Sequence, residues 1–187
     1  MSAECLGNDE RRALLGLARK AIARRLKLDR PAPSTAAASG LTERNGCFVT
    51  LHKAGRLRGC IGRFTSDEPL PRTVEEMAEA AAFEDPRFPP LSKNELDEID
   101  LEISVLTPMR RVARPDEVEV GRHGVYIIRG HCRGVLLPQV ATENFWDRET
   151  FLEHTCLKAG LGRDLWKDPK TEIYVFSAEV FGEKEIG

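Results

Sequence analysis

One cysteine of this chain lies in a setting that favours chemistry. Residues 57–62 read Leu57-Arg58-Gly59-Cys60-Ile61-Gly62, so that a thiol lies between two glycines and close to an arginine. Glycine weakens a strand and usually marks a bulge or a close approach by backbone or ligand. The thiolate is the nucleophilic form of cysteine, and a nearby cation such as Arg58 favours it. Cys60 is therefore the candidate catalytic residue, as a nucleophile or as a redox or radical-handling thiol.

Two other interpretations of Cys60 stay open. It contacts a ligand or partner without chemistry, or it is a small core residue, because free cysteine is among the most buried residue types. His123, His131 and His154 are possible bases, but no spacing selects one of them. The candidate binding residues are polar, charged or small, and they are Arg58, Gly59, Gly62, Asp85, Arg87, Glu102 and Gln139.

The segment 85–91 is the second unusual stretch. It reads Asp-Pro-Arg-Phe-Pro-Pro-Leu. Proline lacks a backbone donor and restricts the residue before it, so this segment is neither helix nor strand. A stiff, charged loop is suited to forming the wall of a cleft, from which Arg87 approaches Cys60. The alternative is a rigid connector in which Arg87 forms an ion pair with Asp85 or with a glutamate.

Composition limits the class of protein. The 187 residues are 41% hydrophobic and 31% charged, with a net charge of −2, which is typical of a globular chain with one core. That charge gives no basic excess for nucleic-acid binding. No run approaches the roughly 18 apolar residues of a membrane span, and the N-terminus lacks a signal-peptide pattern. We expect a single cytoplasmic domain over residues 1–187, bound neither to nucleic acid nor to a membrane.

The cysteines predict free thiols. They lie at positions 5, 47, 60, 132 and 156, and their odd number and wide spacing favour neither disulfides nor a structural zinc site. His154 and Cys156 are two residues apart on a predicted helix and face different directions, which makes a poor chelate. We expect no metal site, no cofactor and a reducing compartment.

Periodicity predicts the elements that position these residues. A helix over 8–28 has an apolar stripe and a face rich in arginine, which suits a membrane or nucleic acid, or is simply a solvated face. We favour the solvated face, because acidic residues elsewhere balance its charge. A hairpin over 46–62 with a four-residue turn would place Cys60 opposite Val49, on the same face as Leu51 and Arg58.

The order hairpin, helix, strand occurs twice, over about 46–106 and about 123–181, and Arg58-Gly59 in the first copy matches Arg133-Gly134 in the second. We therefore predict an α+β fold of duplicated β-β-α-β units that form a mainly antiparallel sheet with packed helices. The second copy has valine where the first has Cys60, and leucine where the first has Gly62. Such departures are where function is expected.

Six short sequence motifs of this chain also occur in a known protein family. They are, in chain order, residues 57–62, 85–91, 103–108, 123–125, 134–140 and 158–161. In them the chain resembles the AMMECR-one family, whose prokaryotic members are called AmmeMemoRadiSam system protein A. The resemblance implies an α+β fold with a duplicated unit, and action with a Memo-like protein and a radical S-adenosylmethionine protein in a modification pathway. The substrate would be a small molecule or a protein. The alternative is a non-catalytic adaptor that presents the Arg-Gly-Cys cleft to a protein partner.

Overall fold

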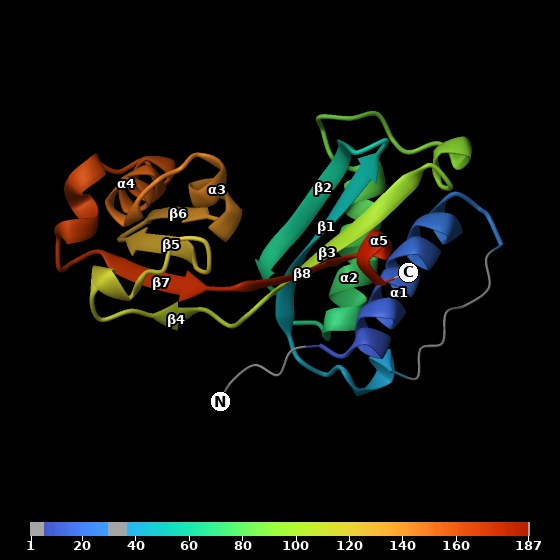
Figure 1. Cartoon of the computed structure of the whole chain (residues 1–187), viewed down its shortest axis with the longest axis horizontal. Coiled ribbons are helices and arrows are strands. Elements are labelled where there is room, and N and C mark those ends of the chain that lie inside the picture. Colours follow the sequence, from blue (N-terminus) through green and yellow to red (C-terminus); the bar gives the residue numbers. More distant parts are fainter. Residues whose placement is uncertain (1–5, 30–36, 187) are drawn as a thin grey trace. The chain divides into compact units, whose positions relative to one another are not determined.

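The computed structural model of the chain describes residues 6–29 and 37–186. They form two compact units (Figure 1). The first unit comprises the described residues up to Leu106 and those from Glu179 onward, and the second is Thr107–Ala178. Each unit has its own sheet and its own core.

The first unit is built on a four-stranded sheet in the order β2-β1-β3-β8. Its strands are β1 (Asn45–Lys53), β2 (Arg56–Thr65), β3 (Ile99–Leu106) and β8 (Ala178–Gly182). Its α-helices are α1 (Asn8–Arg25), α2 (Leu70–Phe83) and α5 (Glu183–Ile186), and short 3-10 turns lie at Ala38–Gly40 and Lys93–Glu95. Helix α2 packs on β1 and β2, and α1 packs on α2 and β3 (Figure 1).

Alternation along β1 decides which side chains face the helices. Cys47, Val49 and Leu51 are fully buried in the core of the first unit, whereas Phe48 and Thr50 are half-buried on the opposite face. Successive side chains of a strand point to opposite faces of the sheet. We call the face of β1, β2 and β3 that carries Phe48 and Thr50 the outer face.

The predicted partner of Cys60 is wrong by one residue. Strands β1 and β2 are antiparallel, with Thr50 opposite Cys60. His52 is opposite Leu57, but Leu51 is opposite Gly59, so Arg58 is an extra residue in β2. A bulge of this kind shifts the register of every later pair. Cys60 consequently lies on the outer face with Thr50, and not on the core face with Leu51.

The second unit is a sheet in the order β4-β7-β5-β6. Its strands are β4 (Arg110–Arg111), β5 (Gly124–Arg129), β6 (Cys132–Leu136) and β7 (Glu172–Phe176). Its helices are α3 (Pro138–Glu143) and α4 (Arg148–Lys158), with 3-10 turns η3 (Pro115–Glu117) and η4 (Arg163–Lys167). Asp147 caps α4, because its carboxylate accepts the Thr150 N–H at 2.8 Å.

The α+β class, the antiparallel pairing and the packed helices are confirmed. The single sheet shared by both repeats is wrong. The end of the second predicted repeat is divided at Ser177 into two strands, so that β7 pairs in the second sheet and β8 in the first. Strand β8 lies beside β3 in the first sheet, and β4 lies beside β7 in the second. Strands β3 and β7 therefore each have a neighbour on both sides and cannot pair with each other. The chain enters and leaves the second unit at adjacent residues, since the Thr107 N–H donates to the Ser177 carbonyl at 2.9 Å.

Two matching glycines let a helix approach each sheet. A Cβ atom on Gly59 would overlap the Ala81 carbonyl oxygen of α2, and one on Gly134 would overlap the Ala159 amide nitrogen at the end of α4. Only glycine allows so close an approach of two backbones. Gly59, predicted as a binding residue, therefore has a packing role.

The arginine-rich face of α1 is paired with carboxylates. Arg11 contacts Glu179 at 2.7 Å and Arg19 contacts Glu183 at 2.6 Å. The Glu183 carboxylate is the main cause of a raised pKa of Arg19. These ion pairs tie α1 to the C-terminal elements of the unit. Within the described ranges, 6–29 and 37–186, no helix has the length and apolar character needed to cross a membrane.

Candidate functional site

The Cys60 thiol is part of a row of polar side chains on the outer face. Cys60 lies on β2, and the Thr50 hydroxyl of β1 donates a hydrogen bond to its Sγ at 3.3 Å. Glu102 of β3 lies opposite Thr50 in the register. All three residues are half-buried. The row brings a thiol, a hydroxyl and a carboxylate onto one face of three neighbouring strands.

The backbone of Cys60 is held by the loop that follows α2. Because β2 is an edge strand, its outward N–H and C=O groups have no strand partner. The Cys60 N–H donates to Asp85 Oδ2 at 2.9 Å, and Arg87 Nη2 donates to the Cys60 carbonyl at 3.3 Å. The loop thus takes the place of a neighbouring strand and fixes the position of the thiol.

Asp85 is the buried anchor of this loop, with 1% of its side chain exposed. Arg87 donates to both carboxylate oxygens, from Nε at 2.9 Å and from Nη2 at 2.7 Å. These bonds hold the pKa of Asp85 far below its usual value, with the Cys60 N–H acting in the same direction and burial in the opposite one. Asp85 is therefore an anion with both oxygens occupied, which suits it to hold Arg87 and Cys60 rather than to accept a proton.

Arg87 remains available on its outer side. Its side chain is 54% exposed, and the hydrogen bonds to Asp85 are the main cause of its raised pKa. The guanidinium carbon lies 5.5 Å from the centroid of the Phe88 ring, and that of Arg58 lies 5.9 Å from the same ring. Phe88 was not among the predicted site residues. Its position between two prolines and directly after Arg87 is the signal that would have found it.

Arg58 serves the loop and not the thiol. Its side chain is 11% exposed. The guanidinium donates from Nε to Glu95 at 3.0 Å and from Nη2 to the Pro89 carbonyl at 2.9 Å. Arg58 is the main cause of the lowered pKa of Glu95. The sequence predicted Arg58 as the cation beside Cys60, but Arg87 is the arginine that contacts Cys60.

The two glycines beside Cys60 do not leave open space. A Cβ atom on Gly62 would overlap the ring of Phe48, which in turn packs edge-on against Phe64 with the ring centroids 5.1 Å apart. The space at Gly59 is taken by α2. Neither glycine therefore leaves an open space beside Cys60, which is half-buried on the outer face.

The second unit holds the other predicted residues, which are Gln139, His123, His131 and His154. Gln139 is exposed on α3. His123 is buried, its Nδ1 accepts the Glu119 N–H at 3.1 Å, and burial is the main cause of its lowered pKa. His154 stacks on Trp146 with 3.9 Å between ring centroids.

Among the described residues, Cys47, Cys60, Cys132 and Cys156 are free thiols. Cys47 and Cys156 are buried, and burial raises the pKa of Cys47 to about 12. A thiol with such a pKa is inert at neutral pH. In the part of the chain that the structure describes, no three His, Cys, Asp or Glu side chains are grouped as metal ligands.

The fold and the cluster define an α+β protein that carries a thiol on the edge strand of an antiparallel sheet, with the strand held by an Asp-Pro-Arg loop. The AMMECR1 family model matches residues 15–181. The chain therefore belongs to the AMMECR1 family, as the resemblance of its motifs predicted.

Relatives cover almost the whole chain. A protein of Methanothermobacter thermautotrophicus is 45% identical over 95% of this chain and 96% of its own length. Protein MK0488 of Methanopyrus kandleri is 46% identical over 97% of this chain and 92% of its own. The crystal structure of the uncharacterised protein PH0010 of Pyrococcus horikoshii matches with a TM-score of 0.81 and 40% identity, over 96% of this chain and 94% of that one. The family and the fold therefore rest on sequence and structure together.

Proposed function

We propose that the outer face around Cys60 is the functional site of this protein, and that it acts with a Memo-like and a radical S-adenosylmethionine protein in a modification pathway of a reducing cytoplasm. The observation that supports this best is the set of hydrogen bonds that holds the backbone and the thiol of Cys60 in place. Of the four described cysteines, Cys60 has its backbone N–H and C=O bound by a charged loop and its Sγ bound by a hydroxyl. A fixed thiol is what a nucleophilic or redox step requires.

In this proposal each residue of the cluster has a role. Cys60 reacts with the substrate or holds it, and Thr50 stabilises negative charge on sulfur. Glu102 and the exposed side of Arg87 bind polar groups of the substrate, which is a small molecule or a protein. Asp85 acts only through Arg87 and Cys60, because both of its oxygens are already occupied.

An internal duplication would explain why only one unit carries the thiol. We infer that both units derive from one β-β-α-β unit, since β2-β1-β3 and β6-β5-β7 have the same order and Gly59 and Gly134 have the same packing role. Val135 follows Gly134 where Cys60 follows Gly59. The β-β-α-β unit therefore does not need a thiol at this position in order to fold.

Alkylation rates test the reactivity of Cys60. With limiting iodoacetamide at neutral pH, we expect Cys60 to be labelled faster than Cys132, and Cys47 and Cys156 to be labelled only on unfolding. Thr50→Val should slow labelling of Cys60 about fivefold, because the lost hydrogen bond contributes about 1 kcal/mol. Peptide mass spectrometry over a time course gives the rate of each cysteine.

Cys132 is the matched control, since it is also half-buried but lies in the second unit. Its rate should not respond to Thr50→Val. If Cys60 reacts no faster than Cys132, and Cys60→Ser has no effect on the pathway in cells, the catalytic role of Cys60 is refuted.

A non-catalytic adaptor is the second candidate, and the surface at Phe88 favours it. The Phe88 ring lies under the guanidinium groups of Arg58 and Arg87, and Arg87 is half-exposed. Arginine and aromatic residues are enriched among the residues that dominate binding energy at protein interfaces. In this case Cys60 contributes shape to a docking surface and not chemistry.

Binding to a purified Memo-like protein from the same organism separates the two functions. For the adaptor we expect Arg87→Ala to weaken binding about thirtyfold or more, which corresponds to about 2 kcal/mol, and Cys60→Ser to leave it unchanged. Arg72→Ala is the matched control, because Arg72 is 65% exposed on α2. Calorimetric titration gives the affinities, and equal affinities for Arg87→Ala and Arg72→Ala would exclude Arg87 as the anchor.

A further inference from the structure

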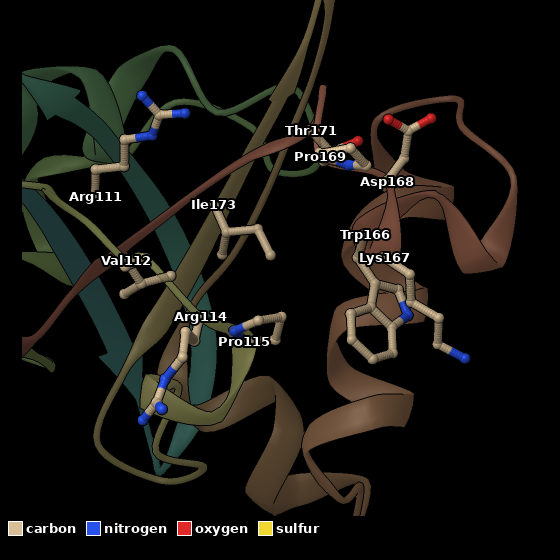
Figure 2. Close-up of a pocket in the computed structure, with 11 residues that line it drawn as sticks. Arg111, Val112, Arg114, Pro115, Trp166, Lys167, Asp168, Pro169, Thr171 and Ile173 are labelled. Carbon is tan, nitrogen blue, oxygen red and sulfur yellow. The ribbon is translucent and has the colours of Figure 1, made fainter.

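A cavity in the second unit has no role in the function proposed above. It has a volume of about 510 Å³ and lies between the segment of β4 and η3 and the segment of η4 and β7 (Figure 2). Its floor is apolar, since Val112 and Ile173 are buried, and Pro115 and Trp166 stand on its two sides. Volumes of this size are typical of sites for small molecules.

The rim of the cavity carries three exposed cations, each of which is paired with a carboxylate. Arg111, Arg114 and Lys167 lie around it, with 60%, 74% and 54% of their side chains exposed. The acidic residue of the lining, Asp168, is already neutralised, because its carboxylate contacts Arg129 at 2.9 Å. The hydrogen bond from the Lys170 N–H is the main cause of a lowered pKa of Asp168, and the bond from Arg129 acts in the same direction.

The carboxylates near the rim leave room for another anion. Glu172 lies 3.7 Å from the Arg111 guanidinium, and Asp116 lies 3.1 Å from that of Arg114. Exposed ion pairs of this kind contribute little to stability. A ligand anion that binds both arginines would replace contacts that cost little to lose.

Trp166 provides the flat surface of the cavity. Its six-membered ring lies on the side towards Pro115 (Figure 2), and the Lys167 Nζ lies 4.9 Å from the ring centroid. The buried indole Nε1 has no hydrogen-bond partner among the described residues. This nitrogen is buried away from the opening, so Trp166 offers the cavity the apolar surface of its ring.

We propose that this cavity binds a small planar anion, namely an aromatic or other flat ring that bears a carboxylate, sulfonate or phosphate group. The ring lies between Pro115 and Trp166 over the apolar floor, and the anionic group lies at the rim near Arg111 and Arg114. The proposal rests on the second unit alone and is independent of Cys60.

The fluorescent dye anilinonaphthalene sulfonate is a suitable probe, because it joins flat rings to one anionic group. Its uncharged relative phenylnaphthylamine has similar rings without the sulfonate. We expect the sulfonate dye to bind with one-to-one stoichiometry and to quench tryptophan emission. The Trp166→Phe variant, which retains Trp146, should lose most of this quenching.

Charge-reversal variants test the rim. Arg111→Glu and Arg114→Glu should each weaken binding of the sulfonate dye about tenfold, a loss of about 1.4 kcal/mol, and should change binding of the uncharged dye little. Arg122→Glu is the matched control, since Arg122 is 68% exposed in the same unit and does not line the cavity. Equal effects of the three variants on the sulfonate dye would refute the assignment of the anion to this rim.

A blocking variant tests the cavity itself. Ala113 is exposed and lines the opening, so Ala113→Trp should fill it without disturbing the core. We expect this variant to lose both dyes and to keep the thermal midpoint of the native protein. Full binding of either dye by a folded Ala113→Trp variant would show that the dye binds elsewhere, and the proposal would fall.

Discussion

Gly59→Ala is expected to lower the free energy of unfolding by about 3 kcal/mol, at the upper end of the range for overpacked sites. The new Cβ would overlap the carbonyl oxygen of Ala81, which is helix backbone and cannot turn away as a flexible side chain would. Helix α2 would have to move off the sheet, and its buried residues would lose contacts with β1 and β2. Urea unfolding followed by circular dichroism measures the loss.

Gly40→Ala is the matched control, because among the described residues, its chain neighbours aside, no atom lies within 4 Å of the Cβ position at Gly40. Its stability should stay within about 0.5 kcal/mol of the native protein. Gly134→Ala should destabilise the second unit in the same way, since its Cβ would meet α4. If Gly59→Ala unfolds at the urea concentration of Gly40→Ala, the close packing described at this position does not exist.

Asp85→Asn is expected to cost about 2–3 kcal/mol at neutral pH. The neutral amide loses the charge that holds Arg87, and removing one partner of a buried ion pair typically costs about 3–5 kcal/mol. The lower figure applies because Arg87 is half-exposed and can turn to water. The amide oxygen can still accept one hydrogen bond, so Asp85→Ala should cost more than Asp85→Asn.

The same residue gives the protein an acid-sensitive component of stability. The pKa of Asp85 in the folded state lies far below its ordinary value, which is about 4 in an unfolded chain. Its contribution is therefore complete above about pH 4 and is lost as the pH falls towards the folded-state pKa. The native protein should lose more stability than Asp85→Asn between about pH 4 and about pH 2.

Asp67→Asn serves as the matched control, because Asp67 is exposed in the same unit. Its unfolding free energy should follow that of the native protein through the whole acid range. Parallel acid profiles for the native protein and Asp85→Asn would mean that the carboxylate is not charged and paired as described.

Much of the fold could be predicted from local pattern. Helix α1 begins at residue 8, as predicted, and ends three residues before the predicted end at 28, and β1 and β2 form the predicted hairpin over 46–62. What the pattern could not supply was long-range pairing. The break at Ser177, which sends β7 and β8 into different sheets, changes neither the alternation nor the apolar content of that segment.

The sequence predicted residues of the site but not the strand register that places Cys60 on one face of the sheet. The ion pair of Asp85 with Arg87 and its closeness to Cys60 were expected, and both are present. The bulge at Arg58 was not, because nothing in the residue types shows where a strand takes an extra residue. That one residue determines which face carries the thiol, so it reversed the predicted neighbours of Cys60.

The return of the chain through β8 has a consequence for synthesis. The second unit is continuous in the chain, whereas the first is complete only when β8 and α5 have followed it. Glu183 of α5 binds Arg19 of α1 and accepts the Leu101 N–H of β3. Helix α1 and strand β3 are therefore synthesised before the residue that completes their contacts. On the ribosome, the unit that is made second is therefore the one able to finish folding first.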